Sequence, residues 1–254
     1  MNHLSYTARR FGGLERLYGV AGAKNIRDAH VAIVGIGGVG SWSVEALARS
    51  GVEKLTLIDF DHIAESNINR QIHALDNTLG LSKVQAMKQR IAQINPQCEV
   101  VCVDEFVTSD NWPLILSAKV DAVIDACDQI KAKTAMAAWA LRTDTLFITV
   151  GAAGGKRSAH KVDIEDLSLT THDPLLAQLR YRLRREHHAP RDKKKIGVFC
   201  VYSKESVAPA DASCQIEGNN DGSLNCHGYG SVVSVTATFG QCAAGWVIDK
   251  ISTL

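Results

Sequence analysis

The sequence lacks several features that mark common protein classes. Its seven cysteines include no CxxC pair, so the usual spacing of a four-ligand zinc site is missing and we expect no structural zinc. The N-terminal region contains no apolar stretch of signal-peptide length. Without an export signal, we expect a cytoplasmic protein whose thiols stay reduced.

The chain also lacks a Walker-type phosphate loop and any internal repeat. The stretch GAAGGKRS (151–158) is similar to such a loop, but only three residues separate Gly151 from Gly155. In addition, Arg157 stands where the motif has Ser or Thr. We therefore interpret these glycines as a turn that follows a strand.

No hydrophobic run is long enough to be a clear membrane span. Residues 231–248 carry no charge over 18 positions, but the segment is short and rich in Ser, Thr, Gly and Gln. We expect a buried helix that packs on a sheet. Peripheral membrane association through this segment is the alternative.

Short apolar runs alternate with helical patterns through the first two thirds of the chain. With 254 residues and 46% hydrophobic content, the chain can bury a large core. Continuous apolar strands separated by helices predict a parallel sheet covered on both faces, that is, a Rossmann-like, doubly wound α/β fold. The predicted strands are 31–35, 55–59, 99–104, 120–126 and 145–151; the predicted helices are 41–51, 82–94, a stretch around Leu114, and 131–142.

The alternation breaks after Gly155. Residues 161–167 and 197–203 read as strands, 173–186 as a helix, and a polar stretch (209–223) precedes the last helix. We expect residues 1–155 to form the nucleotide-binding domain with an N-terminal arm. Residues 156–254 would form a smaller subdomain packed on it.

A glycine-rich loop follows the first predicted strand and opens a helix. It runs Gly35-Ile-Gly37-Gly38-Val-Gly40, and Asp59 lies 19 residues after Gly40 at the end of the next strand. Glycines allow the backbone to approach a phosphate at the helix N-terminus, and an acid at this position can bind ribose hydroxyls. The pattern predicts a bound nucleotide and fits NAD as well as any other.

A second group of residues distinguishes between nucleotides. Arg and Lys side chains together with Mg²⁺-binding carboxylates can stabilise charge on a phosphoryl group in transfer, which an NAD dehydrogenase does not need. All of these residues are expected at the carboxyl edge of the sheet. They are Asp59, Asp61, Asn67, Asn69, Arg70, Gln71, Lys83 and Asp128.

Together with the glycine loop, these residues resemble the ubiquitin-activating-enzyme-like superfamily of adenylating enzymes. Segments 10–19, 71–75 and 235–240 resemble its branch that dehydrates threonylcarbamoyladenosine in tRNA. The resemblance implies an ATP-dependent ring closure at tRNA position 37, through an acyl-adenylate, with release of AMP and pyrophosphate. ATP and magnesium are the implied cofactors, and a homodimer and a cysteine-desulfurase sulfur-acceptor system are implied partners.

The resemblance also assigns roles to single residues. Gly37, Gly38 and Gly40 would contact ATP, Asp59 would bind its ribose, and Asp128 would hold magnesium. Asp61 is a further candidate for binding the nucleotide, although an acid at such a position is more often a turn residue. The phosphates would be neutralised by Arg49, Arg70 and Lys83, with Asn69 beside them. Arg10 would reach the active site of the partner subunit. Relatives often have Asn where this chain has Gln129, and the superfamily's zinc cysteines are missing.

Positive charge is concentrated in one segment. Residues 180–195 carry eight Lys or Arg against two acids, whereas the whole chain has a net charge of only +1. Solvated helix faces usually mix both signs, so we expect this segment to bind tRNA phosphates. The cations are Arg180, Arg182, Arg184, Arg185, Arg191, Lys193, Lys194 and Lys195.

Two rival functions stay open at the level of sequence. The chain could adenylate the C-terminus of a ubiquitin-like sulfur carrier, although proteins with that activity usually carry the zinc cysteines that this chain lacks. It could also be a non-catalytic NAD- or nucleotide-binding module, which leaves Arg70, Lys83 and Asp128 without a role. Cys226 is a candidate thiol for sulfur relay, while His73 and His227 receive no role.

Overall fold

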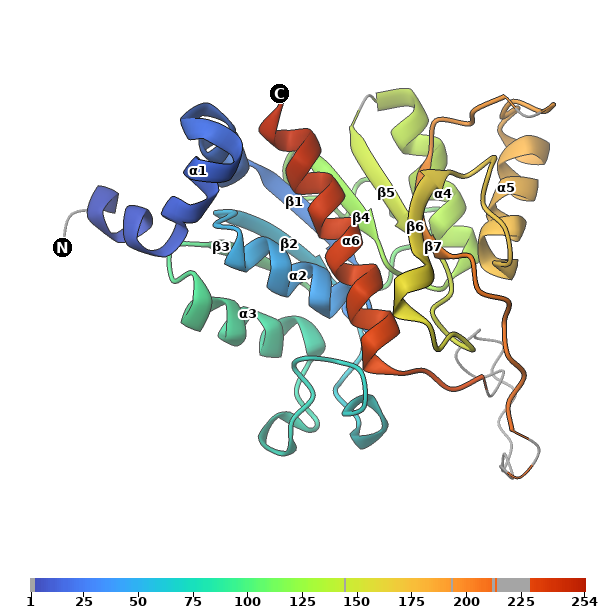
Figure 1. Cartoon of the computed structure of the whole chain (residues 1–254), viewed down its shortest axis with the longest axis horizontal. Helices are drawn as coiled ribbons and strands as arrows, with labels where there is room; N and C mark the ends of the chain where they lie inside the picture. Colours follow the sequence, from blue (N-terminus) through green and yellow to red (C-terminus); the bar gives the residue numbers. More distant parts are fainter. Residues whose placement is uncertain (1–2, 144, 193, 212, 214–228) are drawn as a thin grey trace.

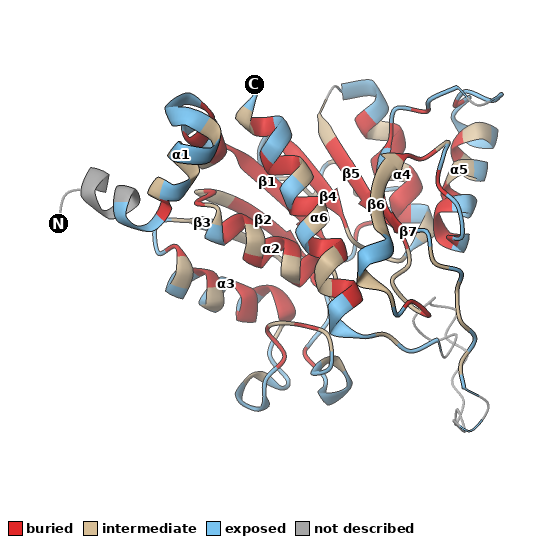
Figure 2. Cartoon of the chain, in the orientation of Figure 1, coloured by how far each residue is buried: buried red, intermediate tan, exposed pale blue. Residues whose placement is uncertain are grey.

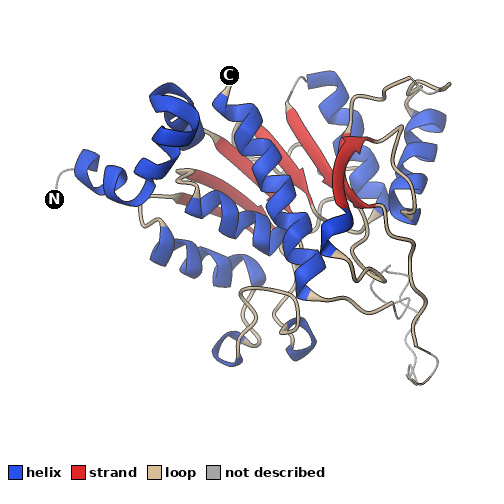
Figure 3. Ribbon diagram, in the orientation of Figure 1, coloured by secondary structure: helices blue, strands red, loops and turns tan. Residues whose placement is uncertain are grey.

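Seven strands form one sheet with helices on both of its faces (Figures 1 and 3). The structure is a computed structural model that describes residues 3–143, 145–192, 194–211, 213 and 229–254. The strands are β1 (His30–Val34), β2 (Lys54–Ile58), β3 (Glu99–Val103), β4 (Ala122–Asp125), β5 (Leu146–Val150), β6 (Val162–Asp166) and β7 (Phe199–Ser203). The helices are α1 (His3–Asp28), α2 (Gly40–Arg49), α3 (Lys83–Ile94), α4 (Ile130–Thr143), α5 (Pro174–Glu186) and α6 (Val233–Ser252).

The strand order places a crevice in the middle of the sheet. The order is β3-β2-β1-β4-β5-β7-β6, and every neighbouring pair is parallel except the edge pair β6 and β7. The chain moves outward in opposite directions from β1 and β4, so their connections diverge. In doubly wound sheets, ligands bind outside the carboxyl ends of the strands at this point. The α/β fold predicted from the sequence is confirmed.

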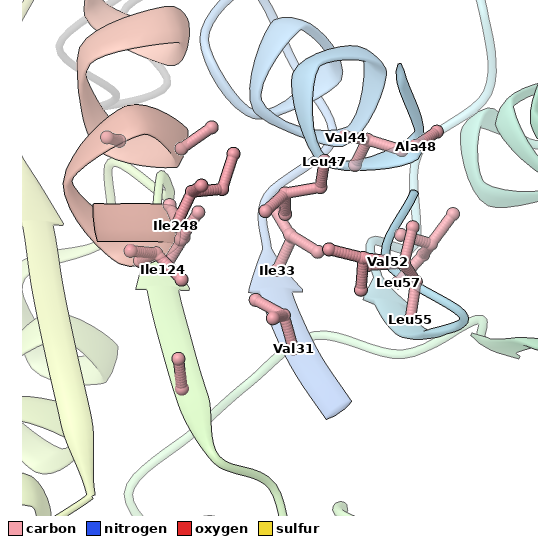
Figure 4. Packing of buried hydrophobic residues seen from close by; sticks show 14 of the residues in the cluster. Val31, Ile33, Val44, Leu47, Ala48, Val52, Leu55, Leu57, Ile124 and Ile248 are labelled. Carbon is pink, nitrogen blue, oxygen red and sulfur yellow. The ribbon is translucent and has the colours of Figure 1, made fainter. Parts of the chain in front are cut away.

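Alternate residues of the central strands face opposite sides, which gives two hydrophobic cores. Val31, Ile33, Leu55 and Leu57 pack with residues of α2, α3 and α6 on one face (Figures 2 and 4). Their neighbours Ala32, Val34 and Ile58 pack with α4 and α5 on the other face. Both faces are therefore apolar, as expected for a parallel sheet between two helical layers.

The uncharged segment near the C-terminus forms α6, a helix on the sheet, as the sequence predicts. Its buried side includes Val235, Phe239, Ala243 and Val247, which recur every four residues. A Cβ at Gly240 would lie 2.4 Å from the carbonyl oxygen of Val39, so the glycine lets α6 approach α2 closely. No helix within the described residues is both long and apolar enough to cross a membrane.

Two elements differ from the sequence expectation. The helix predicted around Leu114 is wrong: turns occupy residues 109–115, and the Leu114 side chain is 84% exposed. Pro113 has no N–H to donate and disfavours helical backbone in the residue before it. Conversely, α1 was not predicted, and it is interrupted at Gly19, whose φ of 74° lies outside the helical region.

A buried ion pair joins three elements below the crevice. Lys133 Nζ of α4 lies 3.0 Å from Asp125 Oδ2 of β4 and 3.0 Å from the hydroxyl oxygen of Thr149 in β5. Both charged side chains are fully buried. Burial alone would lower the pKa of Lys133, but the Asp125 carboxylate raises it, so the lysine stays charged. The pair holds α4 against the strands that end at the crevice.

Candidate active site

A cleft of about 290 Å³ lies at the carboxyl ends of β1, β2, β4 and β5. Its described lining contains the cations Arg70 and Lys83 and four carboxylates. The carboxylates belong to Asp59, Asp61, Glu105 and Asp128. The cleft thus combines both signs of charge at the crevice that the strand order creates.

The glycine loop forms the floor of the cleft at the start of α2. Gly35, Gly37 and Gly38 line the cleft, and Gly35 has a φ of 87°, which favours glycine. Gly40 does not line it: a Cβ there would lie 1.8 Å from the Gly35 carbonyl oxygen. Gly40 therefore permits close packing of α2 on the loop, while the other glycines leave room for a ligand at the helix N-terminus.

Asp59 and Lys83 form the side of the cleft next to β2. Asp59 Oδ2 accepts the Ile36 N–H at 2.6 Å, and its other oxygen accepts the Asp61 N–H at 2.8 Å. Burial raises the pKa of Asp59, an effect that Lys83 opposes. Lys83 Nζ lies 2.7 Å from Asp61 Oδ2 and 3.9 Å from Asp59 Oδ1. The lysine is therefore held beside the glycine loop.

Arg70 covers the loop from the other side. Its Nη1 donates to Ser66 O at 2.8 Å and to Asn69 Oδ1 at 2.9 Å, and its side chain lies against Gly38. Burial lowers the pKa of Arg70. No carboxylate of the described residues forms an ion pair with Arg70. A half-buried guanidinium without an anionic partner is well suited to an anionic ligand.

Asn69 does not line the cleft itself, but it forms hydrogen bonds with two residues that do. Its Nδ2 donates to the Ser231 carbonyl oxygen at 3.0 Å, just before α6, and its Oδ1 accepts from Arg70. Asn69 therefore orients Arg70 and ties the β2–α3 segment (residues 59–82) to the start of α6. Asn67 and Gln71 line the cleft directly.

The loop after β5 is part of the lining, which sequence reasoning missed. Residues 151–154 line the cleft opposite the glycine loop, together with Asp128 after β4. Asp173 caps α5 by accepting the Leu176 N–H at 3.0 Å and also accepts the Ala152 N–H at 2.9 Å. The available signal was the glycine run after a strand, which we interpreted only as a turn.

Arg49 and Arg10 lie outside the cleft in the single chain. Arg49 Nε donates to Glu45 Oε1 at 2.7 Å, and its side chain is 61% exposed. Glu45 also accepts from Arg90 at 2.7 Å. Arg10, on α1, donates to the backbone carbonyl of Ile94. Neither residue is among the described residues that line the cleft with Arg70 and Lys83.

The basic segment is divided between internal and exposed cations. Arg180 Nη1 donates to Leu167 O and to both oxygens of Thr170, at 2.9 to 3.0 Å, so it holds α5 to the turn after β6. Arg184 donates to the Pro190 carbonyl oxygen and Arg182 pairs with Glu186. The exposed cations are Arg185, Arg191, Lys194 and Lys195. Lys193, Cys226 and His227 lie outside the described residues.

Comparison with known proteins agrees with this architecture. Residues 11–254 match the ThiF family. The tRNA threonylcarbamoyladenosine dehydratase of Escherichia coli is 42% identical, over 96% of this chain and 93% of the relative; that of Bacillus subtilis is 37% identical, over 84% and 81%. The chain belongs to the ThiF family, in the group of the tRNA threonylcarbamoyladenosine dehydratases.

Solved structures of the E. coli protein show nucleotide binding in this group. Its complex with ATP matches with a TM-score of 0.87 and 41% identity, covering 97% of this chain and 95% of that one. Its complex with AMP matches with a TM-score of 0.86. The family resemblance inferred from Asn69, Arg70, Gln71 and the glycine loop is thereby confirmed.

A buried histidine follows Arg70 by three residues in this ThiF-family chain. His73 is 2% exposed, and both ring nitrogens lack a hydrogen-bond partner among the described residues. Burial, together with the nearby Lys83 and Arg90, lowers the pKa of His73 to about 4. The ring is therefore neutral at physiological pH and does not serve as a general acid there.

The depressed pKa of His73 predicts a pH-dependent stability. Below about pH 6.5 the unfolded chain binds a proton at this ring, whereas the folded chain does so only near pH 4. The contribution of His73 to the free energy of unfolding should therefore decrease by about 1.4 kcal/mol for each unit by which the pH is lowered from about 6.5 to about 4. Urea unfolding at several pH values measures this slope.

The variant His73→Asn should flatten that slope, because it removes the group that titrates. The exposed His62→Asn serves as the matched control and should keep the wild-type slope. Equal slopes in the wild type and in His73→Asn would contradict the assignment.

Proposed function

We propose that this chain is the enzyme that its relatives' name describes: it dehydrates threonylcarbamoyladenosine at position 37 of tRNA to the cyclic form, using ATP. The observation that carries the proposal is the cleft at the crevice, where Arg70 lies over the glycine loop without an acidic partner. Family membership supports the proposal further, because structures of a relative that is 41 to 42% identical contain ATP or AMP.

The first step is attack by the threonine carboxylate on the α-phosphate of ATP. A carboxylate is already nucleophilic at neutral pH, so the reaction needs positioning and charge stabilisation rather than a general base. The new bond joins a carboxylate oxygen to phosphorus, and the bond to pyrophosphate breaks. Arg70 stabilises charge on the phosphates. Lys83 exchanges its contact with Asp61 for the phosphates.

The second step closes the ring within the substrate. An atom of the carbamoyl arm attacks the acyl carbon, AMP leaves with the former carboxylate oxygen, and a five-membered ring forms. The net change in the nucleoside is the loss of one water, and ATP becomes AMP and pyrophosphate. Because the acceptor belongs to the same arm, no covalent cysteine is required.

Asp128 is suited to hold magnesium together with the nucleotide. It lies in the cleft after β4, and magnesium is commonly bound by one or two carboxylates plus phosphate oxygens. The described residues contain no cluster of three His, Cys, Asp or Glu side chains that could hold a metal by itself. The ion would neutralise phosphate charge when bound. Asp59 would meanwhile bind the ribose, since it is already oriented by the Ile36 N–H.

A homodimer in which Arg10 enters the partner's cleft is part of the proposal. The large apolar side chains of Leu17 and Val20 on α1 are 72% and 71% exposed, which suits an interface. A monomer in analytical ultracentrifugation would contradict the homodimer.

Docking of a sulfur-transfer protein stays an expectation from the resemblance. Calorimetry with a cysteine desulfurase would test whether the two proteins bind.

The decisive assay incubates the protein with ATP, Mg²⁺ and tRNA carrying threonylcarbamoyladenosine, followed by mass analysis of the nucleosides. The wild type should remove one water. Arg70→Ala should lower the rate by about 10²- to 10³-fold, the cost of removing one group that stabilises transition-state charge. Lys250→Ala is the control, because it removes an exposed cation at the far end of α6. Activity of Arg70→Ala equal to the control would refute the proposed role.

The exposed cations of the basic segment should bind tRNA. Replacing Arg185, Arg191, Lys194 and Lys195 by Ala should weaken tRNA binding and flatten its salt dependence by roughly 0.7 to 0.9 in log–log slope per lost phosphate contact. The KM for ATP should stay near the wild-type value. Filter binding at several salt concentrations measures the slope, with Lys250→Ala as control, and an unchanged slope in the quadruple variant would speak against this surface.

A further inference from the structure

A second hollow on the molecule has no role in the proposed chemistry. It has a volume of about 490 Å³ and lies between α4, the turn at residues 109–113 and the end of α5. Of these elements, α4 and α5 lie side by side at one side of the molecule in Figure 1. We call it the tryptophan groove, after the Trp112 and Trp139 side chains that line it.

Two indole rings give the groove an aromatic wall. The rings of Trp112 and Trp139 meet edge to face, with centroids 5.2 Å apart and an interplanar angle of 87°. Trp139 is half-buried, while Trp112 is 7% exposed and its Nε1 has no hydrogen-bond partner among the described residues. The partly open aromatic face of Trp139 suits a ligand with a flat ring.

The charge at the groove is mainly positive. Lys131 and Arg142 lie three helical turns apart on α4, line the groove and are exposed. Neither forms an ion pair within the described residues. Arg182 adds a third cation, and its partner Glu186, at 3.5 Å, is the acidic residue of the lining. Aromatic rings interleaved with cations are typical of sites for single-stranded nucleic acid.

The groove is built partly from the same segments as the two regions that the proposed function uses. Phe106 and Val107 line the cleft, and the same segment continues to Trp112 in the groove. On α4, Ala132 lines the cleft and the adjacent Lys131 lines the groove. Arg182 belongs to the basic segment. The groove therefore shares α4 and the segment after β3 with the ATP cleft, and it shares Arg182 with the basic segment.

We propose that the tryptophan groove binds an unpaired nucleotide of the tRNA that neighbours the reacting nucleotide. Its base would stack on Trp139 and its phosphate would meet Arg142, which lies about one helical turn away on α4, while Lys131 would meet a neighbouring phosphate of the same strand. The inference rests on the proposed function, because that function puts a nucleotide of tRNA in the cleft. It assigns the groove to substrate positioning rather than to chemistry.

The kinetic test compares the KM for tRNA with kcat. Trp139→Leu and Arg142→Gln should each raise the KM for tRNA, the former by roughly five- to a hundredfold as expected for one stacked base. The kcat and the KM for ATP should stay near the wild-type values. Trp139→Phe retains an aromatic face and should restore most of the affinity. A merely structural defect in Trp139→Leu would instead change kcat and the KM for ATP as well. Lys250→Ala is again the control.

A binding experiment separates this inference from the proposed function. Tryptophan fluorescence of the full chain is titrated with an unmodified single-stranded RNA of about eight nucleotides, a length that such sites commonly cover. RNA should quench the wild type, and Trp139→Leu should bind it more weakly. Undiminished binding by Trp139→Leu would overturn the inference, as would equal quenching by an acidic peptide of the same charge. RNA binding without any dehydrated nucleoside from the wild type would contradict the proposed function instead.

Discussion

The site depends on how closely α2 can begin to the end of β1. A Cβ at Gly40 would lie 1.8 Å from the Gly35 carbonyl oxygen, and one at Gly35 would lie 2.8 Å from the Ala126 carbonyl oxygen. Glycine at both positions lets the loop turn between β1 and β4 and begin a helix at once. The N-terminus of α2 then faces the crevice, and Asp59 holds the loop from the next strand through the Ile36 N–H. If α2 could not begin so close to the end of β1, the other cleft residues would not line a shared cavity.

Electrostatics explain why the cleft suits a triphosphate and a carboxylate. Its acids are partly neutralised within the chain, since Asp61 and Asp59 hold Lys83. Arg70, in contrast, contacts a backbone carbonyl and the Asn69 side-chain oxygen, both uncharged. The cost of desolvating Arg70 is therefore offset by weaker hydrogen bonds than those that an anion would accept. The chain thus keeps one guanidinium positioned over the glycine loop and available for phosphate.

Local sequence patterns predicted the parallel sheet and the principal cleft residues because both depend on short-range signals. Apolar runs define the strands, and Arg70, Lys83 and Asp128 follow strand ends or begin a helix, which places them at one edge. The loop at 151–154 was missed because its contribution depends on β5 pairing with β4, a tertiary contact. Arg180 was grouped with the RNA-binding cations, but its partners come from the turn after β6, which sequence spacing does not reveal. The helix around Leu114 failed because Pro113 outweighs the apolar pattern.

The central claim is that a substrate carboxylate attacks the α-phosphate of ATP in this cleft. The most direct measurement uses threonylcarbamoyladenosine tRNA whose carboxylate is labelled with oxygen-18, and then analyses the released AMP by mass spectrometry. If an acyl-adenylate forms and the ring closes on its acyl carbon, each AMP carries one labelled oxygen. Cyclic product accompanied by unlabelled AMP, or label found in inorganic phosphate, would contradict the account.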